Sequence, residues 1–202
     1  NLNTYSNGDS SMSRLITNAI RSTSASADAI TFDNSGKPTF PNGGAGKVIQ
    51  VQSVTKTDTF SSSESAGNLT GPAISLNFTA TSTSNKLLIM ANLMVANSHA
   101  NERIGIVLYA GGSALSSAIG DTDGGRRRIS MGAFNDQDNS YSCISHSHYF
   151  TPASTSQITY DYRLHNGRGA TGTMYLNRDG NNDDNSWHGR GTSTITIMEI
   201  AA

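Results

Sequence analysis

Apolar and polar residues alternate along most of the chain after residue 46. The clearest case is 157–164, where Ile158, Tyr160, Tyr162 and Leu164 would share one face of a strand and polar residues the other. A period of two residues is typical of a β-strand that is buried on one side. The same reasoning predicts further strands over 47–55, 73–78, 103–108, 128–134, 140–150, 171–176 and 192–200.

Residues 86–96 break this alternation because they are apolar on both faces. A strand of this kind is expected at the centre of a sheet that is covered on two sides. The cover would be the second sheet and the N-terminal segment, or another subunit. In the second case the strand would bury a subunit interface, and we expect a trimer interface formed by Leu87, Leu88, Ile89, Met90, Leu93 and Met94.

Eight or more short strands separated by glycine-rich turns predict an all-β fold, an antiparallel two-sheet sandwich of jelly-roll type. Composition supports this prediction, since only 14% of the 202 residues are charged and Ser, Thr, Asn and Gly favour strands and turns over helices. We therefore expect a β-sandwich head domain over 47–202.

Residues 1–46 have too few apolar residues to form a core and are predicted to be an extended arm. Apolar spacing over 11–21 predicts one short helix, and 29–40 predicts a small hairpin with a turn at Asn34-Ser35-Gly36. The arm would anchor the protein to a particle through Leu15, Ile16, Ile20, Ile30, Phe32 and Phe40.

Charge and cysteine content narrow the function classes. The formal net charge is −1, and the basic run 126–128 follows Asp121 and Asp123, so it is interpreted as a turn with locally balanced charges and no nucleic-acid partner is expected. The single cysteine, Cys143, rules out an internal disulfide. No apolar run is long enough for a membrane span and the first residues do not resemble a signal peptide, so we expect a soluble protein with no membrane partner.

Two motifs raise the question of a metal. Residues 179–184 begin like a calcium loop, but its sixth position is Asp184 and its twelfth is Arg190, where glycine and glutamate are required. His146 and His148 would project from the same face of a strand, about 7 Å apart, but no third ligand has a predictable position. We expect no metal and no cofactor, and both places stay open.

The search for catalytic residues gives no candidate: there is no Gly-x-Ser-x-Gly motif, and Cys143 lies within a strand. The protein is therefore not expected to be an enzyme. Tyr175, Arg178, Trp187 and His188 combine aromatic and planar polar groups near loop tips, a combination that suits a sugar. The alternative is that Trp187 covers the end of the core.

Three segments carry a family resemblance: "GKVIQVQSVTKTDTFSSS" (46–63), "TSTSNKLLIMANLMV" (81–95) and "YLNRDGNNDDNSWHGRGTSTITIMEI" (175–200). They resemble the C-terminal β-domain of structural proteins from tailed bacteriophage virions, of the tail-fibre or head-decoration type. The resemblance implies a virion structural protein, commonly a homotrimer, and brings no catalytic residues.

Two roles within that group differ in what precedes the head domain. A fibre is expected to hold its head away from the particle on heptads or a repeated shaft, which this sequence lacks. We therefore expect a homotrimeric capsid decoration (cement) protein whose partners are its own copies and the major capsid protein or another virion protein. It would reside in the virion after assembly in the host cytoplasm. The alternative is a short tail fibre or receptor-binding head that recognises a host surface glycan.

Overall fold

A computed structural model describes residues 17, 19–21, 23, 28–39, 47–137 and 140–202 of the chain. The chain divides into two compact units, Asn1–Gly44 and Ala45–Ala202. Each unit is described by itself.

The N-terminal unit contains a three-stranded sheet of order β1-β2-β3, formed by Ala19–Ile20, Ile30–Phe32 and Pro38–Thr39. The turn between β2 and β3 is held by Asp33, whose Oδ1 accepts hydrogen bonds from the backbone N–H groups of Ser35 and Lys37, both at 2.9 Å. The predicted hairpin is therefore confirmed.

The predicted helix is wrong at its C-terminal end. Ala19 and Ile20 pair with Thr31 and Ile30 as an antiparallel strand, and residues 11–16 lie outside the described part of the chain. A helix of about ten residues is marginal on its own, whereas pairing with β2 satisfies the backbone of Ala19 and Ile20 directly.

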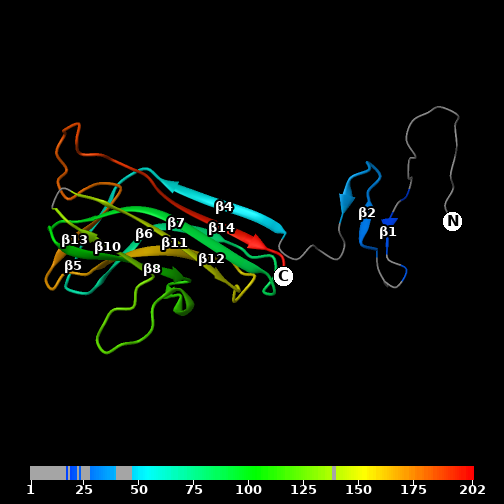
Figure 1. The fold of residues 1–202 in the computed structure, drawn as a ribbon, viewed down its shortest axis with the longest axis horizontal. Coiled ribbons are helices and arrows are strands. Elements are labelled where there is room, and N and C mark those ends of the chain that lie inside the picture. Colours follow the sequence, from blue (N-terminus) through cyan, green and yellow to red (C-terminus); the bar gives the residue numbers. More distant parts are fainter. Residues whose placement is uncertain (1–16, 18, 22, 24–27, 40–46, 138–139) are drawn as a thin grey trace. The chain divides into compact units, whose positions relative to one another are not determined.

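The larger unit is a sandwich of two antiparallel sheets (Figure 1). In chain order its elements are β4 (Val48–Lys56), β5 (Phe60–Glu64), β6 (Leu69–Phe78), β7 (Lys86–Asn97), β8 (Glu102–Ala110), β9 (Ser113–Ala114), a 3-10 turn (Ser116–Ala118), β10 (Met131–Asn135), β11 (Ser142–Phe150), β12 (Ile158–Asn166), β13 (Gly172–Leu176) and β14 (Ser193–Ile200).

The strand order confirms the jelly-roll prediction. One sheet contains β4-β14-β7-β11 and the other β10-β8-β12-β6, so strands that follow one another in the chain mostly change sheet. This exchange is the double Greek key of a jelly roll. β14 pairs with residues 86–92 of β7 and β13 with residues 95–97, while β11 pairs with the opposite edge of β7. β5 and β13 therefore lengthen the first sheet.

The core lies between the two sheets and follows the predicted alternation. On β12, Tyr160, Tyr162 and Leu164 are at most 2% exposed, and Ile158 packs against the same cluster. On β7, Leu87, Ile89 and Leu93 point into this core and are at most 1% exposed. The second sheet therefore covers one face of the doubly apolar strand.

The observed strands differ from the prediction in several places. β6 begins at Leu69, four residues before the predicted start at residue 73. β5 was not predicted, because Phe60 is the only large apolar residue in a segment of serines; β5 exists because β13 supplies its hydrogen-bond partners. The strand predicted from residue 128 begins at Met131 instead.

Candidate functional site

The outer face of the β4-β14-β7-β11 sheet carries no charge over three consecutive rows. Strand register defines the rows, because residues that pair directly share a face. From β4 across to β11 the rows are Val51, Met198, Leu88, Tyr149; Ser53, Thr196, Met90, Ser147; and Thr55, Thr194, Asn92, Ser145. We call these twelve residues the uncharged face.

The apolar end of the uncharged face is open to solvent. Val51 is 51% exposed and Tyr149 54% exposed, and Leu88 and Met198 between them are half-buried. Beyond this row, Val48 is 47% exposed on the edge strand β4, and the next pair on the same face, Ile200 and Lys86, ends the uncharged face with a lysine. A surface of this kind is unusual for a soluble chain, which normally places charged residues on its exposed strands and edges.

The six residues predicted for a trimer interface divide between two environments. Leu87, Ile89 and Leu93 lie in the core of this chain and face away from the uncharged face. Met94 lies on the same side of β7 as Leu88 and Met90, but it is only 7% exposed because the chain at Gly191 lies against its sulfur. Leu88 and Met90 belong to the uncharged face. Within that set the surface available to a partner is therefore Leu88 and Met90.

The six residues predicted to anchor the arm are only partly described. Ile20 is 44% exposed, and Ile30 and Phe32 are half-buried within their small sheet. Leu15, Ile16 and Phe40 lie outside the described residues. The anchoring role stays a prediction.

Strand β13 and the loop that follows it hold the residues predicted to bind a sugar, but they do not form one surface. Tyr175 is 8% exposed, and the Arg178 guanidinium carbon lies 3.9 Å from the centre of its ring. His188 is held by Asp179, with 2.6 Å between Nδ1 and Oδ2, and both side chains are buried. Trp187 is 72% exposed.

Of these four residues, then, Trp187 alone offers a large free ring. Its exposure also rules out the alternative that it covers the end of the core. Gly180 and Asn181 of the same loop line a polar hollow of about 660 Å³, together with Ser98, Asn101 and other polar residues, including Asp136 and Gln137. Trp187 does not line this hollow.

The two places considered for a metal have other contacts: in the 179–184 loop, Asp179 is held by His188, and the two histidines contact neighbouring hydroxyl groups. His146 and His148 stack with ring centres 6.2 Å apart, as predicted from their spacing. His146 Nδ1 lies 2.7 Å from the Tyr162 hydroxyl, and His148 Nε2 lies 3.0 Å from the Ser117 hydroxyl. Burial lowers the pKa of both rings, and for His146 the neighbouring His148 adds to this effect. Among the described residues, no group of three His, Cys, Asp or Glu side chains could hold a metal ion.

Sequence reasoning missed a set of buried asparagines that fasten the loops at one end of the sandwich. Asn166 Nδ2 donates to the carbonyls of Glu64 and Ala170 at 2.8 and 2.9 Å. Asn135 does the same for His99 and Gln137, at 2.9 and 2.7 Å. Both are at most 1% exposed. Because asparagine is equally common in exposed turns, the sequence carries no signal that would have separated these residues.

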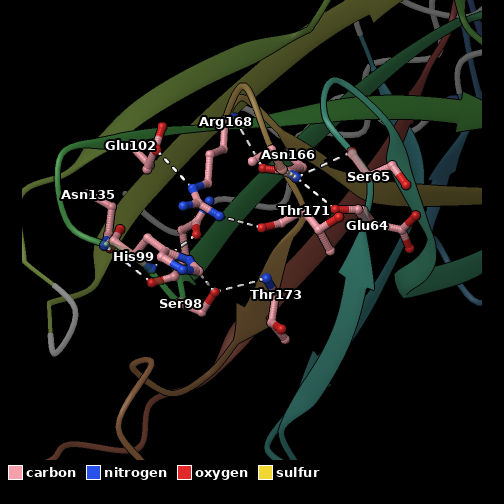
Figure 2. A network of polar contacts seen from close by, with 12 residues as sticks. Glu64, Ser65, Ser98, His99, Glu102, Asn135, Asn166, Arg168, Thr171 and Thr173 are labelled. Atoms are coloured by element: carbon pink, nitrogen blue, oxygen red, sulfur yellow. Dashed lines mark hydrogen bonds and ion pairs between the residues drawn. The ribbon is translucent and has the colours of Figure 1, made fainter.

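Arg168 extends this network toward the surface (Figure 2). Its Nε lies 3.0 Å from Glu102 Oε1, and its Nη1 donates to the carbonyl of Thr171 at 2.5 Å. Nearby, Ser98 bridges to Thr173 through a hydrogen bond from the Thr173 N–H to its hydroxyl at 3.0 Å. The turns that carry Arg168 and Ser98 are therefore fixed by side-chain contacts.

The outer face of the β10-β8-β12-β6 sheet differs because the segment between β9 and β10 lies over it. Val107 and Asp161 have outward parity yet are 1% and 3% exposed. The Ile129 methyl groups fit against Gly105 and Gly132, at 3.1 Å from the position that a Cβ would take in each. This segment carries the basic run 126–128.

The charges of that basic run are less balanced than predicted. Arg126 pairs with Asp123 at 2.5 Å. Arg127 and Arg128 form no ion pair with any described residue; their Nε atoms donate to the backbone carbonyls of Gly67 and Gly120.

Comparisons with known proteins give structural similarity only. No family model and no curated protein matches the chain. Two structures of infectious bursal disease virus, the Gx and Gt strains, are each 14% identical with TM-scores of 0.40 and 0.41. The alignments cover 76% and 93% of this chain but 37% and 43% of the viral chains.

A third structure, the VP2 subviral particle of the same virus, has a TM-score of 0.37 at 14% identity and covers 76% of this chain and 38% of that one. The chain thus spans about two fifths of the length of the proteins it matches. Similarity at this level assigns neither a family nor a function. Among the described residues, no helix is long and apolar enough to cross a membrane.

Proposed function

We propose that this chain is a virion structural protein that assembles as a homotrimer and decorates a capsid, where it clamps neighbouring capsid subunits. The observation that carries the proposal is the uncharged face, whose exposed row includes Val51 and Tyr149. The virion context and the number of three subunits come from the resemblance of 46–63, 81–95 and 175–200 to phage β-domains. The proposal assigns no reaction to the protein.

The uncharged face suits contact between copies of this chain for an energetic reason. Burying a charge in an interface is costly unless it is paired, and the central parts of subunit interfaces are depleted of charged residues. Rows of small Ser and Thr side chains beside Met90 let another protein surface approach closely. A subunit interface of standard size buries roughly 800 Å² on each partner, from about 20–30 residues, so the twelve residues of the uncharged face would form its centre.

The N-terminal unit is proposed to attach the trimer to the particle. Ile20 is 44% exposed, and its small sheet has two short edge strands, β1 and β3. A partner can add a strand to an exposed edge of this kind and gain backbone hydrogen bonds. The partner would be the major capsid protein or another virion protein.

The alternative function is a short tail fibre or receptor-binding head that recognises a host glycan. Trp187 favours this alternative, since an exposed indole ring can stack against a sugar. The buried positions of Tyr175 and His188 count against a site formed by all four predicted residues.

Removal of residues 1–46 tests the proposal. We expect residues 47–202 to stay folded and trimeric in analytical ultracentrifugation. When this truncated protein is mixed with particles, cryo-electron microscopy should show particles without it. A matched control keeps 1–46 and replaces Thr159 with Ala on the exposed surface of β12; this variant should decorate particles normally. If the truncated chain decorates capsids at full occupancy, the anchoring role is wrong. If the full chain is a stable monomer, the trimer is wrong.

A further inference from the structure

A cavity of about 730 Å³, wide open to solvent, lies on the outer side of the β10-β8-β12-β6 sheet beside the segment that covers part of that sheet. Its floor includes Val107 and Tyr109 of β8 and His165 of β12. Its walls are three turns: 66–69 before β6, 124–128 in the covering segment and 167–169 after β12. None of the functions discussed above uses this cavity.

The lining is strongly basic. Four arginines take part, Arg126, Arg127, Arg128 and Arg168, and no carboxylate lines the cavity. Asp123 and Glu102 neutralise Arg126 and Arg168 from outside. Arg127 and Arg128 form no ion pair among the described residues, so two positive charges face the cavity without a counter-charge.

These two arginines are held in place before any ligand arrives. Each uses its Nε to donate to a backbone carbonyl, Arg127 to Gly67 at 3.1 Å and Arg128 to Gly120 at 2.5 Å. These bonds leave both terminal nitrogens of each guanidinium for a ligand. The covering segment is itself fixed, because Ile129 fills the space above Gly105 and Gly132. Fixing a guanidinium in advance reduces the entropy lost when it binds an anion.

His165 lies on the floor of the cavity. Its Nε2 is fully buried and, alone among the buried side-chain nitrogens and oxygens of the described residues, has no hydrogen-bond partner. Burial lowers the pKa of His165, the charge of Arg127 lowers it further, and a backbone contact with Gly67 opposes the shift. Because Nε2 is covered, the ring forms part of the floor and the arginines are the groups that a ligand can reach.

We infer that this cavity binds an oligosaccharide that carries sulfate or carboxylate groups. Arg127 and Arg128 would hold two anionic groups, and Tyr109, which also lines the cavity, would contact the sugar. The inference is independent of the capsid-decoration proposal, because it concerns the opposite side of the sandwich from the uncharged face.

The size and surroundings of the cavity select this class of ligand. A single inorganic anion fills only a small part of 730 Å³, a volume in the usual range for small organic ligands. A nucleic acid would require a basic surface that follows its backbone beyond the cavity, and the chain as a whole carries a net charge of −1. Apolar contacts from Leu69, Val107 and Ile119 beside the arginines suit a sugar ring with charged substituents.

Isothermal titration calorimetry of the full chain with a heparin-derived hexasaccharide tests the inference. We expect a dissociation constant on the order of 10–100 μM at low salt, no measurable binding of uncharged maltohexaose, and loss of affinity as salt rises. The double variant R127Q/R128Q should bind at least about tenfold more weakly, since charge-assisted hydrogen bonds are lost. R127K/R128K keeps the charges but loses the planar guanidinium groups, so its affinity for the hexasaccharide should lie between that of the unmodified chain and that of R127Q/R128Q.

R190Q is the matched control. Arg190 makes one hydrogen bond, to Asn182, on an exposed loop and does not line the cavity, so its loss changes net charge alone and should alter affinity less than twofold. Should R127Q/R128Q fail to fold, phenylglyoxal modification of the unmodified chain replaces it: the hexasaccharide should protect Arg127 and Arg128, and leave Arg190 reactive. No binding, equal losses in R190Q and R127Q/R128Q, equal protection of all three arginines, or equally tight binding of a thymidine oligonucleotide would each overturn the inference.

Discussion

The two outer faces of the sandwich have the same core behind them but opposite surface chemistry. On the β4-β14-β7-β11 side, three rows of residues contain no charge and leave Val51 and Tyr149 open to solvent. On the β10-β8-β12-β6 side, Val107 is buried beneath a covering segment, Asp161 pairs with Arg163 of its own strand, and a cluster of arginines surrounds a cavity.

This difference separates what the fold requires from what function requires. The inward residues on both sheets are large and apolar because they must fill one core. The outward residues are under no such constraint, so their chemistry reflects what each face contacts. A face without charge suits a protein surface, whereas a cavity lined by guanidinium groups suits a small anionic ligand.

A charge placed on the uncharged face should produce the largest effect. Tyr149→Glu adds a carboxylate at a position that is 54% exposed in the single chain, so folding should be little affected. In a trimer that buries this face, an unpaired charge would weaken association by about 100-fold or more, or about 3 kcal/mol. Sedimentation velocity over a range of concentrations would measure the shift.

Phe134→Glu provides the matched control on the other face. Phe134 is an aromatic residue on the edge strand β10, and it is 51% exposed. The comparison predicts that this variant associates as the unmodified chain does. If both variants dissociate alike, or neither does, then the uncharged face is not the interface.

A buried carboxylate, Glu199, lies on the inner side of the sheet that carries the uncharged face. Its contribution to stability should be lost in acid. Glu199 lies between Met198 and Ile200 on β14 but points inward and is fully buried. Burial alone would raise the pKa of Glu199, yet hydrogen bonds from Asn85, Gln50 and Thr81 outweigh burial and lower it from 4.5 to about 2. The unfolded chain therefore binds a proton that the folded chain does not.

Stability from Glu199 is then fully present above pH 4.5 and is lost as pH falls from about 4.5 to about 2. The loss should be about 3 kcal/mol in the free energy of unfolding, measured by urea unfolding at a series of pH values. Glu199→Gln should flatten the pH dependence in that window and lower stability at pH 7. Glu64→Gln, where the carboxylate accepts a side-chain hydrogen bond from Ser62, should leave the dependence nearly unchanged. If Glu199→Gln keeps the full acid sensitivity, another group is responsible.

The covering segment that distinguishes the second face can be loosened by one methyl group. A Cβ at Gly105 would lie 3.1 Å from two Ile129 methyl carbons and 3.2 Å from the His165 Cβ. Gly105→Ala should therefore displace the segment, cost about 1–2 kcal/mol of stability and weaken binding of the hexasaccharide. Thermal unfolding and calorimetry would measure the two effects.

Gly71→Ala is the control, because Gly71 lies in a strand of the same sheet and nothing is within 4 Å of its Cβ position. Its stability should be unchanged or slightly higher. Equal destabilisation by the two substitutions would mean that contact with Ile129 is not the cause.

The sequence predicted the inward-pointing residues of each sheet better than the outward-pointing ones. Alternation placed Tyr160, Tyr162 and Leu164 in the core correctly, because apolar residues at every second position indicate a strand that is buried on one side. It could not show that Val107 is covered, since that depends on a segment folding back from elsewhere in the chain. Arg127 and Arg128 appeared balanced by Asp121 and Asp123, which is a statement about neighbours in sequence.

The binding and docking residues were less predictable for the same reason. Residue types alone brought together Tyr175, Trp187 and His188, but packing buries the first and the last and exposes the second. Register was needed to see that Met198, Leu88 and Tyr149 form one row, because the three residues come from separate strands.

Trp187 belongs to neither face, and its replacement should have the smallest effect on the folded chain. The side chain is 72% exposed, with its ring 6.2 Å from that of His188, so Trp187→Ala should change the free energy of unfolding by less than about 0.5 kcal/mol. Trimer formation and capsid decoration should be unaffected, because neither is proposed to use the loop between β13 and β14. Host-cell adsorption, measured by the loss of free particles from suspension, is the informative result. Unchanged adsorption is expected if the protein decorates capsids, whereas a large loss with assembly intact would transfer the function to the receptor-binding alternative.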